Sequence, residues 1–134
     1  MKFIDDEHKQ FYERKLNEIG RLDVYYRALI YTLSICTITR EHFDNIFNAK
    51  DGEININSIN APYQTGTSLK VTRAAFSLWN SSCVYDSEEN LENEKVSENY
   101  NIGDIFCCSY APYIYEAVKI RYPEYTKSSE EGEG

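Results

Sequence analysis

Apolar side chains recur at the spacing of an α-helix along the first part of the chain. Residues 6–19 combine acidic residues in the first turn, one apolar stripe and Gly20 directly after the last residue. These features are typical of a helix that begins at an acidic cap and ends at a glycine. Residues 24–35 follow, with Asp23 as the N-cap, and their apolar side chains cover more than one face. This second segment is therefore predicted to be a helix at the centre of the fold.

The next segment changes from a helical to an alternating pattern. A third helix is predicted to begin at Thr37 or Thr39, and its apolar side consists of Phe43, Ile46 and Phe47. A turn follows at 50–52, where an aspartate precedes a glycine. Residues 53–56 alternate between polar and apolar side chains, which predicts a short, half-buried strand.

The second half of the chain contains two more helical patterns on either side of a polar interval. A fourth helix is predicted over 67–80, with apolar side chains over a wide arc. Residues 81–100 are polar and acidic and predict a long, mobile surface loop. A short apolar segment, 102–108, precedes a last helix over about 112–122, which has a proline in its first turn and Pro123 as its stop.

These elements predict a mainly α fold, a compact bundle of about five helices with one or two short strands. A chain of 134 residues with 42% apolar and 27% charged content fits one globular domain. We expect that domain to span 1–125, including the acidic mobile loop at about 81–100. Residues 126–134 are expected to form a disordered acidic tail.

The net charge of −8 is concentrated in two segments. Residues 86–98 contain six acids against Lys95, and residues 124–134 contain four acids against Lys127. Without them, 12 acids and 12 bases remain, so the rest of the chain is formally neutral. Binding to nucleic acid is disfavoured, because neutralising phosphates requires clustered lysine and arginine.

Apolar stretches and cysteine usage indicate the cellular compartment. The longest apolar stretch, 24–36, is too short and too polar to span a bilayer, and the first residues do not resemble a secretory signal. We therefore expect a cytoplasmic protein without a membrane partner. A reducing cytosol would keep Cys36, Cys83, Cys107 and Cys108 as thiols. The adjacent Cys107 and Cys108 are either two small buried side chains or a redox pair.

Residues for catalysis or metal binding do not form a recognisable pattern. His8 and His42 are the only histidines, and neither is at metal-ligand spacing from a cysteine or from the other, so no metal site and no cofactor is predicted. Cys36 and His42 lack a third group to orient them as a nucleophile and base. The turn at 50–52 lacks the carboxylates of a calcium loop. No catalytic residue is therefore assigned.

The start of the fourth predicted helix is the candidate ligand site. Free backbone N–H groups and the positive end of a helix dipole attract anions. A glycine, several hydroxyls and two basic side chains surround this helix start, which predicts a site for a phosphate. The ordinary alternative is a Ser/Thr helix cap. The candidate residues are Tyr63, Gln64, Thr65, Gly66, Thr67, Ser68, Lys70 and Arg73.

Tyrosine is unusually frequent, with 12 residues in the chain. Because tyrosine buries a large area and keeps one polar group, it suits both a hydrophobic core and a recognition surface. The sequence leaves these two alternatives open.

Several segments, in this order along the chain, resemble a family of small Firmicutes proteins of unknown function that occurs in chromosomes, phages and mobile elements. They are EHKQFY at 7–12, DVYYRALIY at 23–31, TREH at 39–42, QTGT at 64–67, RAAFSLWN at 73–80, CSYAPY at 108–113 and RYPEY at 121–125. Members of that family often have tryptophan where this chain has Tyr63. The resemblance implies no activity and no residue roles.

Three functions are compatible with these features. The sequence favours a non-enzymatic interaction protein, encoded by a phage or mobile element and acting on a host protein. The alternative is a protein that binds a small phosphorylated or nucleotide ligand at the helix start over 65–68. An enzyme that uses Cys36, His42 or the Cys107–Cys108 pair is the third hypothesis.

Overall fold

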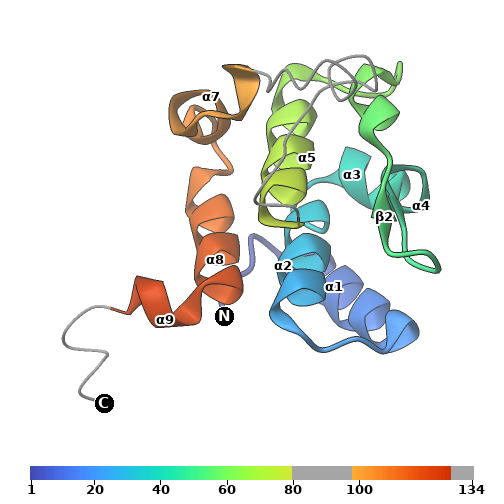
Figure 1. Ribbon diagram of the computed structural model, residues 1–134, viewed down its shortest axis with the longest axis vertical. Coiled ribbons are helices and arrows are strands. Elements are labelled where there is room, and N and C mark those ends of the chain that lie inside the picture. The colour runs from blue at the N-terminus through green and yellow to red at the C-terminus, as the bar shows by residue number, and fades with distance from the viewer. Residues whose placement is uncertain (80–97, 128–134) are drawn as a thin grey trace.

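The computed structural model describes residues 1–79 and 98–127 and confirms the mainly α class (Figure 1). Its first half contains α1 (Asp6–Ile19), α2 (Val24–Leu33), α3 (Thr37–Glu41), α4 (Phe43–Ile46), β1 (Phe47–Asn48), β2 (Glu53–Ile54) and the 3-10 helix η1 (Ile56–Asn60). Its second half contains α5 (Gly66–Trp79), the 3-10 helix η2 (Glu98–Tyr100), α7 (Ile102–Phe106), α8 (Ala111–Arg121) and α9 (Pro123–Thr126).

Helix α2 is the central helix, as its pattern predicts. It packs against α1, α5 and α8, and all residues from Ala28 to Leu33 have no exposed surface. In Figure 1, α7 and α8 lie on one side of α2 and α5, while α1, α3 and α4 lie on the other side. The helix ends at Leu33, two residues earlier than predicted, because Thr39 and Arg40 donate side-chain hydrogen bonds to the carbonyls of Leu33 and Ser34.

The predicted third helix is divided into two short ones. Phe43 and Ile46 are buried in α4, but Phe47 lies in β1, where it pairs with Ile54 of β2 in an antiparallel ladder. Gly52 adopts a positive φ of 67° in the turn between these strands, a conformation that glycine adopts without strain. The strand predicted over 53–56 ends at Ile54, and the chain then forms η1.

The second half follows the predicted order of elements. The short apolar segment forms α7, and the last predicted helix is α8. Helix α8 ends at Arg121, before Pro123 as predicted, and Pro123 then begins a further short helix, α9, which ends at Thr126. Residues 80–97 and 128–134, which contain most of the predicted loop and tail, lie outside the described residues.

The tyrosines contribute to both the core and the surface. Tyr12, Tyr26, Tyr31 and Tyr100 are buried, whereas Tyr25, Tyr115 and Tyr125 are exposed. None of the described helices combines the length and the apolar character that crossing a bilayer requires.

Candidate functional site

The helix start predicted as a ligand site is a reciprocal cap. Thr65 Oγ1 accepts a hydrogen bond from the Ser68 backbone N–H at 3.1 Å, and Ser68 Oγ accepts one from the Thr65 N–H at 2.8 Å. This arrangement is a capping box, and such caps contribute on the order of 1 kcal/mol each. Gln64 extends the network, since its amide oxygen accepts from Ser68 Oγ and its amide nitrogen donates to Thr72 Oγ1.

Part of the predicted site stays accessible. Gly66 and Thr67 are exposed, and a Cβ atom at Gly66 would meet open space. Thr65, Thr67 and Ser68 line a hollow of about 140 Å³, together with Cys36, Thr37, Ile38 and Tyr110. The hollow therefore has room for a phosphate group, and the rest of a nucleotide would lie outside it.

Lys70 and Tyr63 of the predicted site are directed elsewhere. The Lys70 ammonium group donates to the backbone carbonyl of Asp104, which ties α5 to α7. Arg73 is half-buried on α5. Tyr63 stacks on the His42 ring at a centroid distance of 3.7 Å, and its hydroxyl donates to Asn45 Oδ1 at 2.5 Å. Burial raises the pKa of the Tyr63 hydroxyl. The structure thus brings residues 64–68 together and separates them from the Lys70 ammonium.

The thiols and histidines do not form an assembled catalytic group in the described part of the chain. Cys36 Sγ lies 3.2 Å from Thr39 Oγ1, while the His42 ring is stacked on Tyr63. Cys107 is exposed and Cys108 half-buried, so the interpretation of this pair as two buried side chains is wrong for Cys107. Within residues 1–79 and 98–127, no group of three or more His, Cys, Asp or Glu side chains could hold a metal ion.

A different feature is an apolar cleft between α5, α7 and α8. Its volume is about 400 Å³. Ala74, Ser77 and Leu78 of α5 form one wall, and Ile114, Tyr115 and Val118 of α8 form the opposite wall. The remaining lining residues are Tyr100, Ile102, Ile105 and Phe106. Among the described residues of this lining, the hydroxyls of serine and tyrosine are the only side-chain polar groups.

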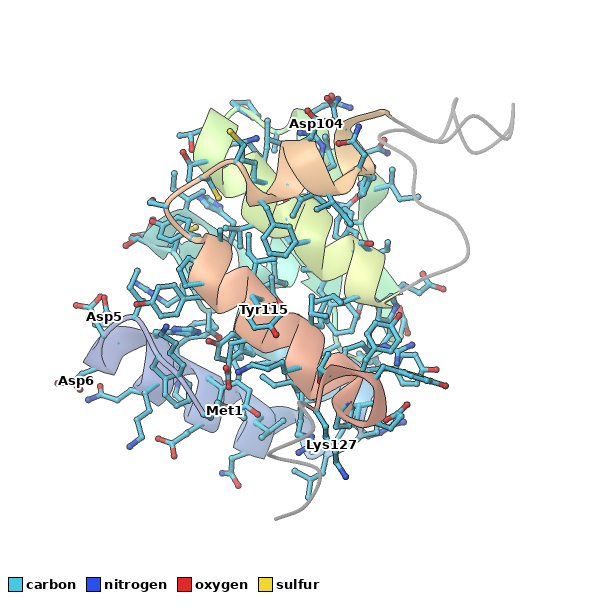
Figure 2. The ribbon with its side chains drawn as sticks, turned by 90° about the vertical axis from the view of Figure 1, so that its left-hand side faces the viewer. Met1, Asp5, Asp6, Asp104, Tyr115 and Lys127 are labelled. Carbon is cyan, nitrogen blue, oxygen red and sulfur yellow. The ribbon has the colours of Figure 1, made fainter. Side chains whose placement is uncertain are left out.

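Three local features position the cleft. The Asn101 side chain accepts a hydrogen bond from the Asp104 N–H at 3.0 Å and so caps α7. Lys70 anchors that short helix to α5, as described above. On α8, residues 114, 115 and 118 share one side of the helix because residues three and four apart are neighbours. Figure 2 shows Tyr115 midway along α8 and Asp104 on α7.

The rim of the cleft exposes apolar side chains to solvent. Ile102 is 77% exposed and Tyr115 is 52% exposed. A single exposed apolar residue needs no explanation, but apolar residues beside an apolar hollow are typical of a recognition site. Sequence reasoning missed this cleft. The one signal for it was the short apolar segment 102–108 next to a polar interval.

The size of the cleft indicates what it can hold. An apolar cavity of roughly 150 Å³ binds one benzene molecule. A volume of about 400 Å³ therefore accepts two or three apolar side chains or a small apolar ligand. Metabolites of ordinary polarity need precisely placed polar groups to orient them, which this lining does not offer.

Comparison with known proteins identifies the family of the chain. A family model described as a family of unknown function (DUF6075) matches residues 1–133. The chain belongs to this family. The match confirms the resemblance to a family of unknown function. The description of the family, DUF6075, gives neither an activity nor residue roles. No curated protein and no solved structure matches the chain.

Proposed function

We propose that this protein is a non-enzymatic interaction protein that binds the apolar face of a partner's amphipathic helix in the cleft between α5, α7 and α8. The observation that carries the proposal is the cleft itself, about 400 Å³ in volume and apolar in its lining. A helix that docks in a groove inserts side chains spaced three and four residues apart. The cleft has room for two or three such anchors.

Charge on the α5 wall supports this choice of occupant. Lys70 lies one helical turn before Ala74 on the α5 wall, and its ammonium group, bonded to the Asp104 carbonyl, places a positive charge between α5 and α7. Acidic side chains beside the apolar face of a partner helix would meet this positive charge.

The proposed partner is a host protein, and this chain is the product of a phage or mobile element. The resemblance to a family that occurs in phages and mobile elements is the reason for that part of the proposal.

We expect that Ile102→Asp abolishes capture of the partner by the immobilised protein. A carboxylate at the rim would have to be desolvated when the apolar face docks, which costs several kcal/mol. Because Ile102 is 77% exposed, this change is expected to alter the free energy of unfolding by less than about 0.5 kcal/mol. The measurement compares proteins captured from the native cytoplasm and identified by mass spectrometry.

Leu22→Asp is the matched control, because Leu22 is 70% exposed and lies between α1 and α2, away from the cleft. A protein retained by the wild type and by Leu22→Asp, but not by Ile102→Asp, supports the proposal. If every captured protein binds all three forms equally, the cleft is not the docking site.

A second proposal is that a small phosphorylated or nucleotide ligand binds at Thr65–Ser68. It is supported by the exposure of Gly66 and Thr67 and by the adjoining hollow of about 140 Å³. A ligand contacted by Lys70 would first have to displace the bond of that lysine to Asp104. The proposal requires nucleotides to raise the melting temperature of the wild type but not of Lys70→Ala.

A further inference from the structure

The leading segment, residues 1–5, is held against the helices by a few specific hydrogen bonds. The Lys2 N–H donates to Glu116 Oε2 of α8 at 3.3 Å, and the Tyr31 hydroxyl of α2 donates to the Lys2 carbonyl. The Ile4 N–H donates to His8 Nδ1 at 3.2 Å. Figure 2 shows Met1 beside α8 and Asp5 at the start of α1. The segment thereby connects α1, α2 and α8.

His8 is the buried centre of these contacts. Its side chain has no exposed surface, and its ring packs against Phe3, Tyr31 and Tyr113 at centroid distances of 5.1, 4.6 and 6.3 Å. The ring contacts the leading segment, α2 and α8. A change in its protonation therefore affects the packing of the leading segment against both helices.

The two bonds of the ring determine where its proton lies. Nε2 lies 3.0 Å from the Tyr31 carbonyl oxygen, which can only accept a hydrogen bond. Nδ1 faces the Ile4 N–H, which can only donate. The ring is therefore neutral, with its proton on Nε2 and a lone pair on Nδ1. A second proton, on Nδ1, would make that nitrogen a donor that faces the Ile4 N–H, which is also a donor.

We propose that protonation of His8 releases the leading segment from α2 and α8, so that residues 1–4 act as a pH-sensitive strap. The added proton removes the acceptor for the Ile4 N–H and places a positive charge among aromatic rings. Detachment of Phe3 and Ile4 lets water reach the charged ring. The bond from Nε2 to the Tyr31 carbonyl can persist, so α1 and α2 stay packed. This inference is independent of the proposed function of the cleft.

The charged and titratable groups around His8 come from every element packed against it. Asp5 precedes α1 and favours the protonated ring, while Arg40 of α3 opposes it. Arg40 is itself paired with Glu7 at 3.1 Å. The other titratable neighbours are Lys2 of the leading segment, Tyr31 of α2, and Tyr113 and Glu116 of α8. No described carboxylate forms a direct bond to the ring.

Burial lowers the pKa of His8 below its ordinary value, and Arg40 adds to this effect, while the Tyr31 carbonyl and Asp5 oppose it. The attached state therefore binds fewer protons than the released state. Attachment is fully stable above the free histidine pKa of about 6.5 and weakens as the pH falls toward the lowered value. Across that interval the released fraction rises by at most tenfold per pH unit, because one proton is involved.

Hydrogen exchange of the Ile4 amide, measured by NMR on the whole protein, tests the proposal. After correction for intrinsic exchange, its protection factor is expected to fall as the pH drops below about 6.5, by at most tenfold per pH unit. Amides of α5 are expected to keep higher protection at each pH, which separates local release from unfolding. If Ile4 and α5 have the same protection factor, or if Ile4 protection is constant from pH 7 to 5, the proposal is overturned.

Two variants make the assignment to His8 specific. His8→Gln keeps a donor and an acceptor but cannot gain a proton, so we expect a pH-independent Ile4 protection factor. His42→Gln is expected to retain the wild-type slope. An unchanged slope in His8→Gln would contradict the proposal. Should that variant not fold, the wild-type His8 imidazole resonances decide, because a measured pKa at or above 6.5 would also overturn it.

Discussion

Arg121→Ala is expected to lower the free energy of unfolding by about 3 kcal/mol. Arg121 is 9% exposed, and its Nε donates to the Leu78 carbonyl in the last turn of α5 at 2.9 Å. A hydrogen bond from a charged donor contributes about 1.5–3 kcal/mol. The guanidinium group also lies over the rings of Tyr25 and Tyr122, at 3.8 and 4.4 Å. Contacts of this kind contribute about 0.5–2 kcal/mol.

The position of this arginine explains why the loss should be large. Its positive charge lies at the negative end of the α5 dipole, where carbonyls lack partners within the helix. Alanine would leave the Leu78 carbonyl without this donor and open a gap between two rings. Because Arg121 joins α8 to α5, the variant also loosens the two walls of the cleft.

Urea unfolding at neutral pH measures this effect, and Arg21→Ala is the matched control. Arg21 also lies over an aromatic ring, that of Tyr26 at 4.7 Å, and pairs with Asp23 at 3.3 Å, but its side chain is 59% exposed. Exposed pairs contribute little, so we expect a loss below about 1 kcal/mol there. Arg121→Lys keeps the charge without the planar group and should fall between the two. Equal losses in Arg121→Ala and Arg21→Ala would contradict this account.

Ser77→Trp is expected to weaken partner binding about 100-fold while raising stability by about 1 kcal/mol. Ser77 is half-buried and lines the cleft from α5. An indole ring at this position would occupy the space proposed for the partner's anchors. Loss of such anchors costs about 2–4 kcal/mol of binding energy. The indole also buries apolar area of its own, which contributes roughly 25 cal/mol per Å².

The opposite signs of the two effects separate occupation of the cleft from damage to the fold. Asn57→Trp is the control, since Asn57 is a polar residue exposed on η1 that does not line the cleft. It should leave the affinity for the captured partner unchanged, as measured by calorimetry or surface plasmon resonance. Full affinity in Ser77→Trp would show that the partner binds elsewhere.

Local signals in the sequence predict most of the helices because those signals are themselves local. Helix α1 has the predicted bounds, since Asp5 accepts from the His8 N–H and Gly20 closes the helix in a left-handed conformation. The end of α4 at Ile46 was not predictable in the same way. It depends on the pairing of Phe47 with Ile54, and strand pairing between separate segments leaves no local pattern.

The candidate site was harder to predict than the fold. The residues at 64–68 were correctly recognised as a helix start, but their bonds to one another are seen only in three dimensions. The direction of Lys70 depends on α7, which lies 34 residues later in the sequence. The cleft joins side chains from α5, α7 and α8, and its volume depends on how these helices pack.

Site-specific photo-crosslinking from the rim of the cleft tests the central claim most directly. A benzophenone amino acid in place of Ile102, which is 77% exposed, would lie against the partner without filling the cleft, whereas the same group in place of Asn57 would not contact the partner. In native cells, we predict one discrete protein adduct from position 102 and none from position 57. Its linked peptide should belong to an amphipathic helix. No adduct from position 102, or the same adducts from both positions, would contradict the account.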